Sequence, residues 1–250
     1  MAIRQRPGFP VNVERTAKVT EKTNVYFDLK PGQSVNLRFT PPSDESGELF
    51  FVSAQHFKMK QEGQPRAYAC LRAHGVDQEC PICVFLERIE EVFADNDTLR
   101  EKLHREHDVA YRWHAQVVPV PKEGQGLAEQ TYVIGLSKAT ADKVSKILMM
   151  EKDNRLILLT DPDEGQAINI SRNEKTGFGT RYEVMPTGLR MSLDAITTVN
   201  AAGVPAWEEK FLNVRDALKL RIEKPESLYP IIAETVGIVA FAKVFPEVTL

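Results

Sequence analysis

The chain has 250 residues, of which 42% are hydrophobic and 27% charged, and its formal net charge is −3 with a pI near 6.0. This composition is typical of a soluble globular protein with one main domain or two small ones. The longest apolar runs, such as residues 236–242, are too short to span a membrane. The acidic net charge argues against a nucleic-acid-binding protein with a uniformly basic surface. If this chain binds nucleic acid, its positive charge must be gathered on one face. With no targeting segment in view, we expect a reducing cytoplasm and no membrane partner.

The chain begins with a basic arm over residues 1–22. This stretch contains Arg4 and Arg6, is interrupted by proline and glycine, and holds five basic residues against two acidic ones. We expect the arm to be mobile in isolation.

Short strands separated by proline and glycine breakers follow along most of the chain. They are predicted at residues 34–40, 50–57, 109–118, 130–136, 155–160, 166–172, 180–185 and 188–193. Helical periodicity is found at residues 84–106, with a break at 95–97, at 137–150 and at 205–222.

Helices inserted among closely spaced strands favour a mainly β fold of the α+β class, built around a small antiparallel barrel. We therefore expect a barrel-like core over residues 23–195, an insertion within it at about 50–108, and a C-terminal helical segment over 196–250.

All three cysteines of the chain, Cys70, Cys80 and Cys83, lie within the expected insertion, and His56 precedes them. A Cys-x-x-Cys turn directs two thiolates to one point, and a third cysteine with a histidine can complete a closed tetrahedral zinc site. Because a closed site leaves no position for a reacting water, we expect one structural zinc ion.

The histidine of this site has two candidates. His56 lies in a predicted strand, whereas His74 lies in the loop between Cys70 and Cys80. We favour His56, since a closed zinc site can recruit a ligand from a neighbouring strand, and His74 remains the alternative.

Two other classes of function are compatible with the cysteines. The run from Cys80 to Cys83 followed by a helix could belong to a thiol–disulfide oxidoreductase, but that motif should follow a buried strand, and residues 71–79 are polar. A zinc-stabilised module that binds a protein or duplex DNA is the other possibility. We find no phosphate-cradling glycine loop, nucleophile elbow or paired carboxylates, and we expect no enzymatic activity.

The cysteine spacing, the strand pattern and the run from Asp161 to Arg172 resemble the single-stranded DNA-binding proteins of tailed phages, of the T-even helix-destabilising type. The resemblance covers roughly residues 30–195. It implies an oligonucleotide-binding (OB) fold with an inserted zinc subdomain, whose ligands would be His56, Cys70, Cys80 and Cys83.

The resemblance also implies a function and partners. The chain would bind single-stranded DNA without sequence preference, cooperatively with neighbouring protomers, in phage DNA replication, recombination and repair. Arg4 and Arg6 would contact the next protomer, and replication proteins are possible partners. The family's strongly acidic C-terminal tail has no counterpart, because residues 222–250 hold four acidic and two basic residues.

Single strands are bound by basic grooves and by aromatic faces on which bases stack. Three segments of the chain combine both residue types, and the strongest candidate is the loop from Arg172 to Tyr182 because it combines glycines with an aromatic flanked by cations. Tyr111 and Trp113 share a strand face and are equally well explained by a core position. The candidates are Phe57, Lys58, Lys60, Arg66, Tyr68, Tyr111, Arg112, Trp113, Arg172, Lys175, Phe178, Arg181 and Tyr182.

Overall fold

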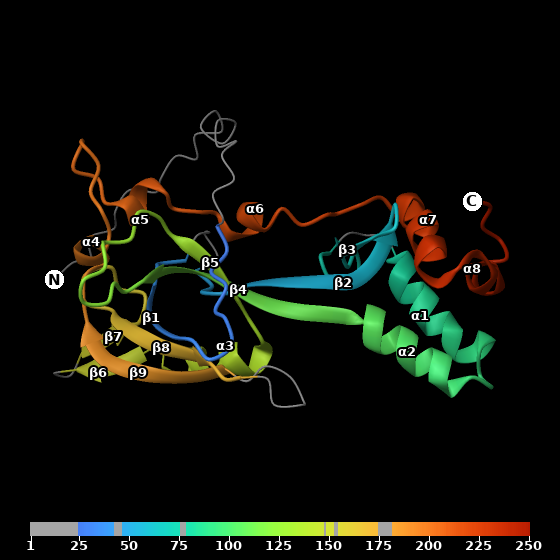
Figure 1. Ribbon diagram of the computed structural model, residues 1–250, viewed down its shortest axis with the longest axis horizontal. Helices are drawn as coiled ribbons and strands as arrows, with labels where there is room; N and C mark the ends of the chain where they lie inside the picture. Colours follow the sequence, from blue (N-terminus) through green and yellow to red (C-terminus); the bar gives the residue numbers. More distant parts are fainter. Residues whose placement is uncertain (1–24, 43–46, 76–78, 148, 153–154, 175–181) are drawn as a thin grey trace.

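The fold is α+β, with a seven-stranded antiparallel sheet and eight helices among the described residues. The structure is a computed structural model that describes residues 25–42, 47–75, 79–147, 149–152, 155–174 and 182–250. Figure 1 shows an elongated molecule, with a sheet lobe at one end and a helical lobe that carries the C-terminus at the other. None of the described helices is both long and apolar enough to cross a lipid bilayer.

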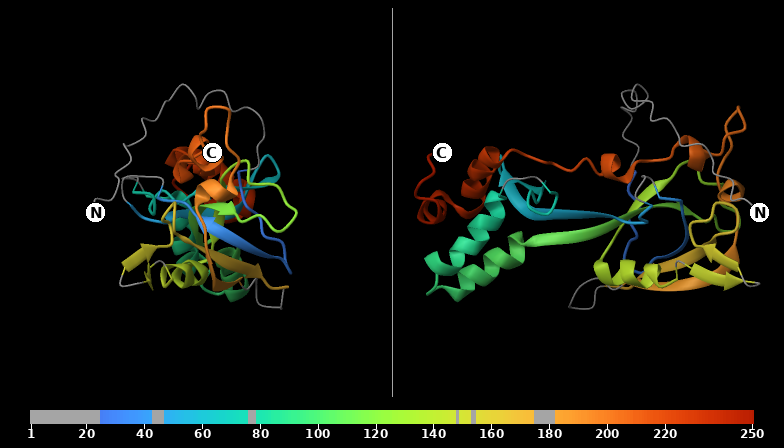
Figure 2. Two further views of the ribbon diagram at one scale, coloured as in Figure 1. Left: turned by 90° about the vertical axis from the view of Figure 1, so that its left-hand side faces the viewer. Right: turned by 180° about the vertical axis from the view of Figure 1, so that it is seen from behind.

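Strand β4 (Val109–Pro119) organises the sheet because successive parts of it pair with three other strands. Its first half pairs with β2 (Phe51–Gln61), its middle with β5 (Tyr132–Leu136) and its end with β1 (Ser34–Phe39). The two long strands β2 and β4 cross from one lobe to the other (Figures 1 and 2).

The remaining strands extend the sheet at both ends. The hairpin partner β3 (Gln64–Ala69) lies beside β2, β8 (Gln166–Arg172) beside β1, and β9 (Tyr182–Arg190) beside β8. A separate two-stranded sheet consists of β6 (Met149–Lys152) and β7 (Arg155–Leu158). The ladders between the described strands form an open path from β3 to β9, so closure into a barrel stays a prediction.

The core of the sheet lobe lies on one face of these strands. Alternate residues of β1, β4, β5 and β8 are buried there, as expected for strands with one face turned to a core, and α3 (Lys138–Ser145) closes it with Ala141 and Val144. A smaller cluster surrounds Trp207 where α4 (Leu193–Ile196) meets α5 (Ala206–Glu209), and the Trp207 indole donates a hydrogen bond of 2.6 Å to Asp194.

The helical period at residues 84–106 is confirmed as two helices, α1 (Pro81–Val92) and α2 (Asp97–His107). The chain breaks where predicted because the Asn96 side chain caps α2 by accepting a hydrogen bond from the backbone of Leu99.

Three other predicted boundaries are wrong. The helix expected at 205–222 is instead α5 and the short α6 (Val214–Leu218), because tertiary bonds such as the one from Thr131 Oγ1 to the Lys210 carbonyl hold the intervening backbone. Helix α3 ends at Ser145, ahead of strand β6. The two strands expected at 180–193 are the single strand β9.

The C-terminal helices α7 (Pro225–Val236) and α8 (Ile238–Val244) complete the helical lobe. Their apolar side chains share one buried cluster with α1, to which they contribute Leu228, Ile231, Ile232, Phe241 and Phe245. On the surface, Arg88 of α1 donates to the Val244 carbonyl and to Glu247. Residues 225–250 are therefore an integral part of this lobe.

Helix α7 also fixes the tip of the β2–β3 hairpin. Glu62 and Gly63 both have positive φ values, 55° and 73°, which is the geometry of a tight two-residue hairpin turn. The carboxylate of Glu234 accepts hydrogen bonds from the backbone N–H groups of both turn residues, at 3.1 and 2.6 Å.

Arg38 is a buried cation that holds the sheet lobe together without a carboxylate partner at bonding distance among the described residues. It is fully buried, and its guanidinium donates to the carbonyl oxygens of Met191, Leu159 and Asp161 at 3.0, 2.6 and 2.5 Å. Burial lowers the pKa of Arg38 to about 10. The loop that supplies one of these carbonyls passes so close that a Cβ atom at Gly165 would lie 2.5 Å from both Arg38 Nη2 and the Asp161 oxygen.

We therefore expect Gly165→Ala to lower the free energy of unfolding by about 1–3 kcal/mol, because the added methyl group must displace the guanidinium or the backbone. Gly126→Ala is the matched control, since a Cβ there meets nothing within 4 Å. Urea unfolding of both variants measures the difference. Equal stabilities would contradict this role of Gly165.

Candidate metal centre and nucleic-acid interface

Four side chains in the helical lobe converge on one point. The ligand atoms of His56, Cys70, Cys80 and Cys83 all lie within 4.8 Å of one another. His56 Nε2 is 3.4 Å from Cys80 Sγ and 3.6 Å from Cys83 Sγ, and Cys70 Sγ is 3.5 Å from Cys83 Sγ. A tetrahedral zinc ion with bonds of about 2.0–2.3 Å would separate its ligands by roughly 3.5–3.8 Å, so the geometry fits a metal ion of this kind.

Different elements of the lobe supply these ligands. His56 is on β2 and Cys70 follows the end of β3. Cys80 directly precedes α1, whose first turn contains Cys83. Pro81 at the first helical position starts α1 directly after Cys80, which places the two thiols of the Cys-x-x-Cys turn on the same side. A bound ion would therefore tie a strand, a hairpin end and a helix together.

The orientation of His56 leaves Nε2 free to bind a metal. Its Nδ1 lies 2.8 Å from the His107 carbonyl and donates to it, which fixes the ring and its tautomer as is usual for metal-binding histidines. The structure places His74 outside the cluster, because its Nε2 is 3.2 Å from the backbone nitrogen of Ala54 and 3.1 Å from its oxygen.

The electrostatics of the cluster favour a bound cation. Burial opposes the charged form of His56, but hydrogen bonds to Cys70 and Cys80 prevail and raise its pKa to about 9. Hydrogen bonds from Cys70 and Cys83 lower the pKa of the Cys80 thiol, while hydrogen bonds to Cys70 and Cys80 raise that of Cys83. Three thiols so close together cannot all ionise unless a cation neutralises them, which a divalent metal ion would do.

The second candidate site is the stretch of the β2–β4 ladder between the lobes. Tyr111 and Trp113 lie on one face of β4, with ring centroids 6.4 Å apart, and the paired residues of β2 are Ala54 and Val52. Tyr111 is 50% exposed, and Trp113 is half-buried against the core of the sheet lobe. Helices α2 and α3 lie on the same side of the ladder at its two ends (Figures 1 and 2).

The other predicted contact residues have different surroundings. Tyr68 is fully buried and donates to Gln61, so its ring has no free face and it leaves the candidate interface. The guanidinium of Arg172 is bound to the Leu29 carbonyl at 2.6 Å and lies 6.0 Å from the Tyr182 ring. Lys58, Lys60 and Arg112 are exposed, whereas Phe57, Arg66 and Tyr182 are half-buried. Lys175, Phe178, Arg181, Arg4 and Arg6 lie outside the described residues.

Sequence reasoning missed two residues. His107 supplies the carbonyl that orients His56, and Lys102 of α2 lines a cavity together with Lys58 and Lys60. Neither has a signal in the sequence, since both reach these positions through the packing of α2 against β2.

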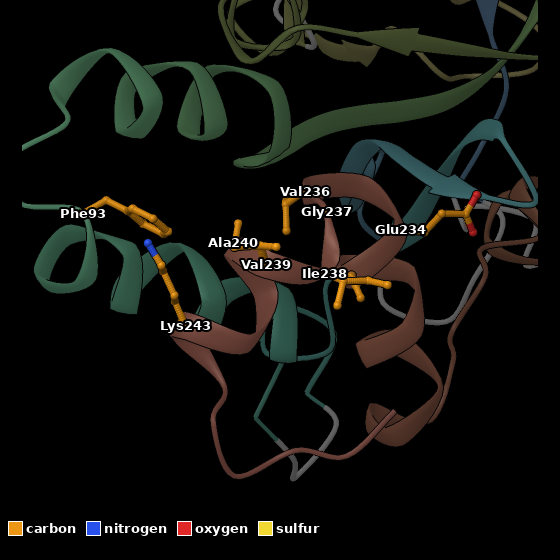
Figure 3. A pocket seen from close by; sticks show the side chains of 9 residues that line it. Phe93, Glu234, Val236, Gly237, Ile238, Val239, Ala240 and Lys243 are labelled. Atoms are coloured by element: carbon orange, nitrogen blue, oxygen red, sulfur yellow. The ribbon is translucent and has the colours of Figure 1, made fainter.

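A larger hollow, with a volume of about 600 Å³, is lined by Phe93 after the end of α1 and by residues of the α7–α8 junction and α8. Figure 3 shows the side chains of these residues. The hollow is mostly apolar, with Ile238 and Val239 exposed, and its two ionisable groups are already engaged. Glu234 accepts from the hairpin turn, and the Lys243 ammonium lies 5.8 Å from the centre of the Phe93 ring. The hollow therefore offers no arrangement for acid–base chemistry.

Neither a family model nor a curated protein matches the chain.

His56→Ala should remove most bound metal, and His74→Ala should leave the metal content unchanged, because only the first histidine of this pair lies at the cluster. The amount of metal per chain, measured by elemental analysis after dialysis against a weak chelator, tests this. A metal-free His74→Ala variant beside a loaded His56→Ala variant would reverse the assignment.

Proposed function

We propose that the chain binds single-stranded DNA without sequence preference, and that it does so cooperatively to protect and organise strands in phage DNA replication, recombination and repair. The observation that carries the proposal is the pair of accessible aromatic rings, Tyr111 and Trp113, on an open stretch of sheet between two lobes. The sequence resemblance to the phage proteins supports it independently.

The aromatic pair suits base stacking. Every base has a π face, so a stack on an aromatic side chain tolerates any sequence and contributes about 1–3 kcal/mol. The two rings follow the direction of β4, and a strand lying along the ladder would meet them in succession. Tyrosine and tryptophan have large apolar rings and are enriched where a protein surface contacts a partner, so an exposed Tyr111 beside a partly exposed Trp113 favours a binding surface.

Basic residues of the helical lobe would supply phosphate contacts. Lys58 and Lys60 are exposed on β2, the strand that pairs with the aromatic segment. Arg112 is also exposed, but its position between Tyr111 and Trp113 on β4 turns its side chain to the opposite face of the ladder. Because the chain as a whole has a charge of −3, the positive potential would be local to this region.

In this proposal the metal is zinc and its role is structural. Three sulfur ligands and one imidazole are the donor set that zinc prefers, and His56 and Cys80 are fully buried, which suits a closed site. Zinc would supply folding free energy to a lobe whose ligands come from separate elements. Thiolate ligands need reduced cysteines, which agrees with a cytoplasmic location in the host cell.

We further propose that the sheet lobe is an OB-like barrel. The sheet continues from β4 through β1 and β8 to β9, and residues 25–27 pair with β5 through hydrogen bonds at Val133. Contacts between protomers along the strand would involve the basic arm with Arg4 and Arg6, and replication proteins would be further partners.

A zinc-stabilised module for protein binding is the second candidate, favoured by the exposure of Ile238 and Val239. The thiol oxidoreductase has less support, because Cys80 is fully buried, whereas an attacking thiol must be accessible.

Oligo-thymidine should bind tightly and a duplex of equal length weakly, and the affinity for the single strand should fall with salt at a log–log slope of about −0.7 per phosphate neutralised. Fluorescence anisotropy of labelled DNA measures both quantities. Equal affinities for the single strand and the duplex, or affinities unaffected by salt, would contradict the proposal and favour the protein-binding module.

Tyr111→Ala should weaken single-strand binding by about 1–3 kcal/mol, the value of one base stack. Leu127→Ala is a matched control, since Leu127 has a similar exposure, 46% against 50%, in the loop between β4 and β5. Unchanged affinity in the tyrosine variant, with the fold intact, would remove the aromatic pair from the interface.

A further inference from the structure

Three lysines surround one cavity on the helical lobe. Lys58 and Lys60 of β2 and Lys102 of α2 line a space of about 450 Å³. All three are exposed, and none forms an ion pair with a residue in the described part of the chain. Glu106 is the one acidic residue in the lining. Among the described residues, the lining therefore carries more positive than negative charge, and its lysines are not neutralised by ion pairs.

The backbone at Lys58, on the wall of this cavity, is strained. Lys58 has a φ of 57°, in an irregular stretch of the ladder between His56 and Met59. A left-handed conformation is unfavourable for a residue with a Cβ atom, and such strain is typically kept where it serves a function. The register shift places Met59, which pairs with Arg66, on the same face as His56, which pairs with Tyr68. Met59 is buried there, and Lys58 and Lys60 on either side of it are exposed.

The walls of the cavity are fixed by the hydrogen bonds around the metal site. His107, which lines the cavity, has its Nδ1 3.2 Å from the Phe57 carbonyl, and its own carbonyl accepts from His56. On the other side, the backbone of Lys60 donates to Thr235 Oγ1 at 2.8 Å. The lysine side chains thus project from a rigid frame, so less ordering is needed when an anion binds.

We propose that this lysine pocket binds a phosphate group, and that its physiological ligand is a phosphodiester of the single strand. The second part rests on the function proposed above, and the first does not. Ammonium groups are strongly attracted to phosphate oxygens, and three of them around a concave surface concentrate the field. The pocket would hold the backbone while the aromatic pair on β4 receives bases.

Lysine acetylation read by mass spectrometry locates the ligand. In the zinc-loaded protein we expect both oligo-thymidine and inorganic pyrophosphate to protect Lys58, Lys60 and Lys102, with Lys122, Lys219 and Lys224 as exposed lysines that stay reactive. Protection by pyrophosphate alone would keep the phosphate site and overturn its role in strand binding. No protection by either ligand would overturn the inference, and tight DNA binding in that case would leave the proposed function standing.

Two sets of variants separate this role from folding. Lys58→Gly should raise the midpoint of thermal unfolding, because glycine relieves the positive φ, and should still weaken oligo-thymidine binding several-fold. Replacing Lys58, Lys60 and Lys102 by Gln should reduce the salt slope by about 0.7 for each phosphate that the pocket no longer neutralises. The same replacement at Lys122, Lys219 and Lys224 removes equal charge and should leave the slope unchanged. Equal slopes in both triple variants, or a stabilised Lys58→Gly protein with full affinity, would contradict the proposal.

Discussion

The register between β2 and β4 determines the relation between the two candidate sites. His56 pairs with Val109, Ala54 with Tyr111, and Val52 with Trp113, and opposite residues of an antiparallel pair point to the same face. A slip of one residue would move the aromatic rings to the other face. One ladder therefore places the candidate metal ligand His56, the exposed Tyr111 and the half-buried Trp113 on one face. Whatever stabilises the helical lobe also holds these side chains in place.

The helical lobe depends on contacts between distant parts of the chain. Its metal ligands lie between residues 56 and 83, yet α7 and α8 fill its core from residues 225–250. Glu234 holds the hairpin turn, and the Ala69 backbone N–H donates to the Arg221 carbonyl at 2.9 Å, which attaches the connecting segment to the same hairpin. The buried apolar cluster of this lobe thus joins residues of β2, β3 and α1 to those of α7 and α8, and the candidate metal site lies beside it.

Charged groups are handled in opposite ways in the two lobes. In the sheet lobe the Arg38 guanidinium is buried and satisfied by backbone carbonyls, so its charge serves the fold. In the helical lobe, Lys58, Lys60 and Lys102 face a cavity without ion-pair partners in the described part of the chain. Cations that a protein leaves without counter-charges are available to a ligand, whereas Arg38 is not. The surroundings of each cation therefore show whether it serves the fold or could bind a ligand, which the net charge of −3 does not show.

The amino-acid sequence was enough to predict the three cysteines of the candidate metal site and the class of fold, and it favoured His56 over His74 as the fourth ligand. Cysteine spacing and strand alternation act over short distances, so His56, Cys70, Cys80 and Cys83, the α+β class and the break between α1 and α2 were predictable. Other features could be seen only in the folded chain. Tyr68 is buried while Tyr111 is exposed, and His74 bonds to Ala54. Lys102 lies beside two lysines of β2, and residues 225–250 complete the helical lobe. These features depend on which elements pack together. Segments far away in the sequence determine whether an aromatic ring is buried and which residues surround a lysine.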